Sequence, residues 1–311
     1  MQPFEPAYLR AHKRSELREK IRQALSIQSD CTLCPRQCHV DRIAGETGFC
    51  NTAAMAVVAA YDAHFGEEAP LTGRHGSGTI FFTHCNLLCA FCQNYDISHQ
   101  GAGTPVTDEE LAAIMLRLQR QGCHNINFVS PSHVLPQILS SRPLAVEEGL
   151  NIPLVYNTGG YDSVETLKLL DGVVDIYMPD FKFWDADIAR LTCDAADYRR
   201  IACQALVEMH RQAGDLIVDG QGIARRGILL RHLVLPHGLA GTPQVMQFVA
   251  EKLSKNTYVN VMAQYRPCGR AAQIEHLGRS ITSEEYNEAV SQTKEQGLTR
   301  LDQPKRVFAT W

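Results

Sequence analysis

Three cysteines within eight residues constrain this chain more than any other feature of its sequence. Cys85, Cys89 and Cys92 follow the segment 76–83, which ends in an apolar, β-branched and aromatic run that predicts a buried strand. The loop after a first strand is where a β/α barrel builds its site. Three thiolates there can hold an iron–sulfur cluster that ordinarily takes four, which leaves one iron without a protein ligand.

Two simpler interpretations of these cysteines stay open. A zinc site would need a fourth ligand, for which His84 and His99 are the candidates. A disulfide between Cys89 and Cys92 would need an oxidising compartment, and the sequence shows no export signal. The strand before the loop favours the cluster.

The spacing CxxxCxxC, with Phe91 directly before the last cysteine, resembles the signature of the radical S-adenosylmethionine (SAM) superfamily. The resemblance implies that Cys85, Cys89 and Cys92 are the ligands of a [4Fe-4S] cluster and the catalytic centre. It also implies that SAM binds the open iron and is cleaved by an electron from the cluster, which gives a 5′-deoxyadenosyl radical.

A second group of cysteines lies near the N-terminus. Cys31, Cys34, Cys38 and Cys50 supply four thiols, with glycines beside the last one that allow the backbone to wrap around an ion. Four thiolates make a closed site, which fits structural zinc or a fully ligated second [4Fe-4S] cluster. The spacing alone does not separate these two, nor does it exclude a group of thiols that is merely packed.

The composition narrows the class of protein. The chain has 311 residues, 45% of them hydrophobic, and a formal net charge of -4, so nothing indicates an electrostatic grip on nucleic acid or on an anionic membrane. It shows no apolar run long enough to span a membrane and no secretion signal, so we expect a cytoplasmic protein. Seven of the eleven cysteines fall in the two groups described above, which favours metal or cluster ligation over disulfides.

Alternating helical and strand-like segments predict an α/β fold with parallel βαβ units. We expect a partial (β/α)6 TIM-like barrel of the radical SAM type, with an N-terminal four-cysteine appendage and a C-terminal helix. The expected strands are 76–83, 125–129, 152–156, 174–178, 227–235 and 258–263, and the expected helical stretches include 9–27, 107–122, 134–148, 185–213 and 282–296. The expected domains are 1–70 for the N-terminal helix and four-cysteine segment, 71–275 for the core and 276–311 for a C-terminal helical extension.

Polar side chains at the ends of the expected strands predict the cofactor site, because a barrel collects its chemistry there. Asp180 and Lys182 project the same way from extended backbone and could meet the charged groups of SAM, although a local ion pair or helix cap also explains them. Asn157 offers a hydrogen bond to a ribose or amino group, or else serves a turn. Arg231 could bind a carboxylate or orient SAM, or else face outward.

Longer motifs narrow the resemblance. The N-terminal cysteine motif, the segments around Gly76, Cys85 and Tyr156, and the runs 175–182 and 231–236 together resemble the PflX-like radical SAM proteins, kin of pyruvate formate-lyase activating enzymes. The resemblance implies that Phe91 lies beside the adenine and that Asp180 and Lys182 lie near SAM. Activating enzymes usually carry a Gly-Gly-Glu-type motif where this chain has residues 130–133, so the contact to the SAM amino group passes to Ser130.

We therefore expect an activating-enzyme-like oxidoreductase that abstracts a hydrogen from an unidentified substrate. The substrate could be a glycyl-radical enzyme, another protein or peptide, or a small molecule, and the electron would come from a reductant such as flavodoxin or ferredoxin. We expect neither nucleic acid nor membrane as a partner. The alternatives are a non-catalytic iron–sulfur electron carrier or redox sensor, and a zinc-stabilised binding module, neither of which would need a SAM pocket.

Overall fold

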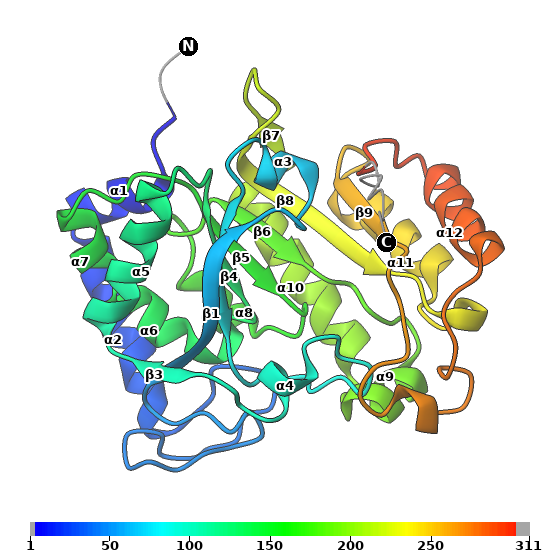
Figure 1. Cartoon of the computed structure of the whole chain (residues 1–311), viewed down its shortest axis with the longest axis horizontal. Coiled ribbons are helices and arrows are strands. Elements are labelled where there is room, and N and C mark those ends of the chain that lie inside the picture. The colour runs from blue at the N-terminus through cyan, green and yellow to red at the C-terminus, as the bar shows by residue number, and fades with distance from the viewer. Residues whose placement is uncertain (1–3, 303–311) are drawn as a thin grey trace, which may run out of the picture.

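A nine-stranded sheet forms the centre of the computed structural model, which describes residues 4–302 (Figure 1). Six strands run parallel and neighbour one another in chain order: β2, β4, β5, β6, β8 and β9. β1 pairs antiparallel with β2 and β3, and β7 pairs antiparallel with the start of β8. The bounds are β1 Ala56–His64, β2 Ser77–Phe82, β3 Thr104–Val106, β4 Ile126–Val129, β5 Leu154–Thr158, β6 Ile176–Pro179, β7 Ile217–Val218, β8 Ala224–Leu233 and β9 Tyr258–Met262.

Helices connect the parallel strands, because a parallel pair cannot be joined by a tight turn. Figure 1 shows α1, α2, α5, α6 and α7 at one end of the sheet and α11 and α12 at the other. The bounds are α1 Ala7–Lys13, α2 Glu16–Ser26, α3 Ala69–Thr72, α4 Tyr95–Ser98, α5 Asp108–Arg120, α6 Leu135–Ser140, α7 Arg142–Glu147, α8 Val164–Lys168, α9 Ala186–Cys193, α10 Tyr198–Ala213, α11 Thr242–Phe248 and α12 Ser283–Glu295.

Two clusters of buried side chains lie on the two faces of the sheet. The large cluster runs through the helices and one strand face, with Phe128 of β4 and Tyr177 of β6 among its fully buried members. The small cluster holds Val155, Met178 and Leu229, which project from the opposite face of β5, β6 and β8. Successive side chains of a strand point to opposite faces. The residue two positions after each of these three therefore lies on the same face of the sheet, nearer its carboxyl edge.

The predicted α/β class and all six predicted strands are confirmed, whereas the partial barrel stays a prediction. The start of β8 differs most, since the strand begins at Ala224 rather than residue 227, and β5 begins at Leu154 rather than residue 152. Pro153 has no N–H to donate to a sheet, so it stands just outside the strand. Sequence reasoning missed β1, whose four alanines have a low strand propensity and which owes its form to pairing with β2 and β3.

Several predicted helical stretches are divided in the structure. The stretch 9–27 breaks at Ser15 and the stretch 185–213 breaks at Asp194, and both residues adopt a left-handed conformation, with φ of 60° and 49°. The stretch 134–148 breaks at Ser141, because Pro143 cannot donate the backbone hydrogen bond that a continuous helix needs. The capping boxes at Thr107 and Thr282 are confirmed at the starts of α5 and α12.

The expected domain boundaries stay predictions. β1 belongs to the expected N-terminal segment and pairs along the edge strand of the parallel sheet. The last nine residues of the expected C-terminal extension, 303–311, lie outside the described residues. Within residues 4–302, no helix is both long enough and apolar enough to cross a membrane.

Candidate active site

Three predicted site residues lie on one face of the sheet, at its carboxyl edge. Asn157 follows Val155 on β5, Asp180 follows Met178 of β6, and Arg231 follows Leu229 on β8, each at a spacing of two residues. The alternation of side chains along a strand therefore turns the face of the small apolar cluster into a polar rim. This is the edge at which parallel sheets place their ligands.

The polar rim is a compact network of charges. Asp180 accepts hydrogen bonds from Lys182 Nζ at 2.5 Å and from Arg231 Nε at 2.8 Å. A second guanidinium nitrogen of Arg231 donates to Asn157 Oδ1 at 2.7 Å. The three charged side chains are only 11 to 17% exposed, so water screens these interactions weakly.

Burial and pairing act in opposite directions on these groups. Burial alone would raise the pKa of Asp180, but Arg231 and Lys182 outweigh it and hold that pKa below its usual value. Burial would lower the pKa of Lys182, but Asp180 outweighs it and holds that pKa above its usual value. The carboxylate and both cations are therefore charged together at neutral pH.

A buried carboxylate supports the rim from below. Asp162, 3% exposed, accepts hydrogen bonds from Ser132 Oγ and Thr158 Oγ1, both at 2.6 Å, and from Tyr156 OH at 3.0 Å. Gly160 lets the turn after β5 approach β6, since a Cβ there would overlap Asp180 O, and its φ of +79° also favours glycine. The loops that follow β4, β5 and β6 are thus held in fixed positions.

The loop of three cysteines follows β2 and adopts a constrained backbone. His84 and Leu88 both have positive φ angles, 66° and 48°, which are costly for residues with side chains and which cluster at functional sites. The Leu87 amide donates to Cys85 Sγ at 3.3 Å, and the Ser98 hydroxyl donates to Cys92 Sγ at 3.2 Å. Hydrogen bonds of this kind stabilise thiolates and tune the potential of a cluster.

The cysteine loop and the polar rim enclose one cavity of about 160 Å³. Eight of the nine residues predicted for the catalytic and cofactor site line it: Cys85, Cys89, Cys92, Ser130, Asn157, Asp180, Lys182 and Arg231. Phe91 is not among the lining residues. Its ring is buried and packs edge-to-face on Phe183 and Tyr265, each at a centroid distance of 5.8 Å.

The donors present fit a three-ligand iron–sulfur cluster. Burial is the main cause that raises the pKa of Cys85, to about 12, and also raises that of Cys92, so these thiols need a bound metal to lose their protons. Among residues 4–302, no three His, Cys, Asp or Glu side chains are grouped as ligands of a single metal ion. A cubane cluster holds its cysteines farther apart than one ion does, because each sulfur binds a different iron. The arrangement therefore suits a cluster better than zinc.

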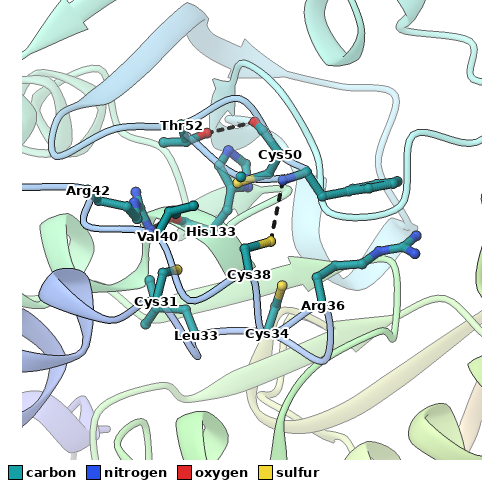
Figure 2. A pocket seen from close by; sticks show the side chains of 12 residues that line it. Cys31, Leu33, Cys34, Arg36, Cys38, Val40, Arg42, Cys50, Thr52 and His133 are labelled. Atoms are coloured by element: carbon teal, nitrogen blue, oxygen red, sulfur yellow. Dashed lines mark hydrogen bonds between the residues drawn. The ribbon is translucent and has the colours of Figure 1, made fainter. Parts of the chain in front are cut away.

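The four N-terminal cysteines form a second, much smaller site in the loop between α2 and β1 (Figure 2). Cys31, Cys34, Cys38 and Cys50 all line one cavity of about 10 Å³. Gly48 allows the loop to close, since a Cβ there would lie within 2.6 Å of both Cβ and Sγ of Cys38. The next amide, that of Phe49, donates to Cys38 Sγ at 3.3 Å.

Arg36 connects the two cysteine sites. Nothing in the sequence indicated that this residue would contact the three-cysteine loop. Its guanidinium donates to Asn86 O at 3.0 Å, to Cys193 O at 2.7 Å and to Asp194 O. It also lies 3.7 Å from the centroid of the Phe49 ring. One side chain from the four-cysteine loop thus holds the backbone beside Cys85 and the end of α9.

Sequence reasoning also underestimated Cys193. It is only 3% exposed, and its sulfur lies 3.3 Å from Cys89 Sγ. The contact joins α9 to the cysteine loop across 104 residues of chain. Nothing local in the sequence marks such a pair, because tertiary packing alone creates it.

The comparisons with known proteins agree with this site. Residues 79–222, which hold the three cysteines and the ends of β2 to β6, match the radical SAM superfamily. An uncharacterized protein of Methanocaldococcus jannaschii is 32% identical over 287 residues, which cover 90% of this chain and 78% of that protein.

A solved radical SAM methyltransferase from Sphaerobacter thermophilus gives a TM-score of 0.47 at 15% identity. The match covers 71% of this chain and 64%, less than two thirds, of the methyltransferase chain. The sequence matches, together with the cysteine loop, show that this chain belongs to the radical SAM superfamily, whose domain implies SAM cleavage at an iron–sulfur cluster.

Proposed function

We propose that this protein cleaves SAM reductively at a [4Fe-4S] cluster held by Cys85, Cys89 and Cys92, and uses the product to take a hydrogen atom from a substrate. One observation carries the proposal: the three thiols and the charged strand-end residues line the same cavity. An electron carrier or redox sensor would have no use for such a polar rim. When bound, the cluster supplies the electron that breaks the sulfonium bond of SAM.

The residues of the cavity divide the work of binding SAM. Lys182 and Arg231 offer cations to the SAM carboxylate, and Asp180 offers an anion to its amino group or ribose. Asn157 positions Arg231 and is 4% exposed, so it orients the guanidinium inside the cavity. We assign Ser130, with its positive φ of 58°, to the SAM amino group.

A buried amide on β4 is unpaired two residues before Val129, which lines the cavity. Both amide atoms of Asn127 are fully buried and have no hydrogen-bond partner within residues 4–302. Asn127 lies on the same face of β4 as Val129, which lines the cavity. Unpaired buried amides are costly, so this one marks a position where a ligand or a water completes the structure.

The finer assignment follows the motif resemblance. We propose a PflX-like, activating-enzyme-like oxidoreductase, with Phe91 near the adenine and a glycyl-radical enzyme, another protein or peptide, or a small molecule as substrate. One electron enters from a low-potential donor such as flavodoxin or ferredoxin, SAM yields methionine, and the substrate's hydrogen atom ends in 5′-deoxyadenosine. The second metal site, a cluster or zinc at the four N-terminal cysteines, belongs to the same proposal, as does a cytoplasmic location.

The test is SAM cleavage by anaerobically reconstituted protein. With a strong reductant, we expect 5′-deoxyadenosine to accumulate beyond one molecule per chain, and Cys89→Ala to reduce it to the level of a protein-free blank. Cys203→Ala is the matched control, since Cys203 is a half-buried thiol that lines neither cysteine cavity. If protein with bound iron and sulfide forms no 5′-deoxyadenosine, the electron carrier replaces the enzyme.

A further inference from the structure

The four-cysteine site is small and largely buried. Cys31, Cys34 and Cys50 are each at most 9% exposed, whereas Cys38, which lines the same cavity, is partly exposed. Figure 2 shows the four side chains gathered around the same space. The cavity of about 10 Å³ is far smaller than SAM, so its occupant is the group that the four thiols themselves hold.

The spacing of the four thiols favours a cluster over a single zinc ion. A zinc ion draws four sulfurs to about 2.3 Å, which leaves no room for another atom between them. The cavity among these thiols admits about one water-sized sphere, so its walls stand farther apart than that. Consistently, no three of the candidate ligand side chains in the described chain are grouped as the ligands of one ion.

The charge around the cavity suits an anionic occupant. Arg36 and Arg42 both line it, and Arg42 is 1% exposed. Arg42 donates to Ala53 O at 2.7 Å and to His133 O at 2.9 Å, so its guanidinium satisfies carbonyls and pairs with no carboxylate in the described residues. Four thiolates bring more negative charge than a cluster core or a zinc ion cancels, and these two cations offset the excess.

We propose that Cys31, Cys34, Cys38 and Cys50 bind a second, fully ligated [4Fe-4S] cluster. This inference deepens the proposed function, because Arg36 ties the second cluster to the backbone beside Cys85, but its existence does not depend on SAM cleavage. Its four ligands leave no iron open to SAM.

The experiment uses a variant of the full chain in which Cys85, Cys89 and Cys92 are all replaced by alanine. After anaerobic reconstitution we expect about four irons and four sulfides per variant chain, against about eight of each for the wild type. The reduced variant should give an electron paramagnetic resonance signal that added SAM does not change. Zinc without iron in the variant, or neither metal, would overturn the proposal.

A second measurement guards against a variant that fails to fold. The wild type is analysed for iron and zinc as purified and after reconstitution, and about four irons with one zinc per chain would also overturn the inference. Failure of the proposed function is a separate result. If the wild type binds about eight irons but forms no 5′-deoxyadenosine, the second cluster stands and SAM cleavage does not.

Discussion

The two cysteine sites both offer thiol sulfurs as ligands, but the surroundings of those sulfurs differ. The three-cysteine loop opens into a cavity of about 160 Å³ rimmed by a carboxylate, two cations and an amide, whereas the four-cysteine loop closes on about 10 Å³. The polar rim thus accompanies the site with three thiols and not the site with four. The comparison teaches that the surroundings of a metal site, more than its ligands, separate a reactive centre from a structural or electron-transfer one.

The largest expected difference between the two sites is the rate at which a chelator removes their iron. In wild-type protein treated with an oxidant and a chelator, we expect two phases of iron loss, each about half of the total, with SAM cleavage lost in the first. The open site loses iron first because it has one thiol fewer and meets solvent. Added SAM should slow the first phase and leave the second unchanged, and a single phase that SAM does not affect would remove the distinction between the sites.

Asp180→Asn tests the rim of the open site. The substitution leaves Lys182 and Arg231 side by side without their shared carboxylate, so we expect the free energy of unfolding to fall by about 3 kcal/mol and SAM binding to weaken. Urea unfolding of the iron-free protein measures the first effect.

The matched control for this loss is Asp187→Asn. Asp187 pairs with Arg190 on the surface, with side chains 80% and 59% exposed, and should change stability by less than about 0.5 kcal/mol. Equal effects of the two substitutions would show that the rim is not a buried network.

Arg36→Met tests the connection between the sites. It removes charged hydrogen bonds to three carbonyls and should lower the free energy of unfolding by about 2 kcal/mol. If Arg36 couples the two loops, iron retention should decline at both sites. Arg18→Met, on the exposed face of α2, is the control and should stay within about 0.5 kcal/mol.

Asp162→Asn should have the smallest effect, on the pH dependence of stability. Burial raises the pKa of Asp162, so the folded protein keeps this proton at pH values where the unfolded chain has already released it. The free energy of unfolding therefore falls as the pH rises above about 4, by at most about 1.4 kcal/mol per unit. The variant should show a flatter profile above about pH 4, and an unchanged profile would mean that the folded carboxyl is ionised throughout.

The sequence predicted what repeats along the chain and missed what only packing creates. The six parallel strands carry short apolar runs, and the polar residues near the carboxyl ends of β5, β6 and β8 lie on one face, as the alternation of a strand requires. β1 escaped prediction because its alanine-rich run is a strand only when paired. Asp194 and Ser15 divide helices through left-handed backbone that their side chains do not announce.

The residues of the candidate site divide in the same way, into those marked by a local pattern and those brought in by packing. Cysteine spacing and strand-end position identified eight of the residues that line the open cavity, because both signals are local. Arg36, Ser98 and Cys193 contact the cysteine loop from distant or irregular segments, and no pattern in the sequence ties them to it. Phe91 was assigned from resemblance alone, and its packing on Phe183 gives that assignment no direct support.

The contact between Cys89 and Cys193 predicts that the iron-free chain is sensitive to air. Their sulfurs lie 3.3 Å apart, and a disulfide needs only about 2 Å. In a chain that has lost its cluster, oxygen can take two electrons and two protons from this pair and lock the cysteine loop to α9. Protein handled aerobically would then need a thiol reductant before it could accept iron, so a failed reconstitution would report on the history of the sample rather than on its active site.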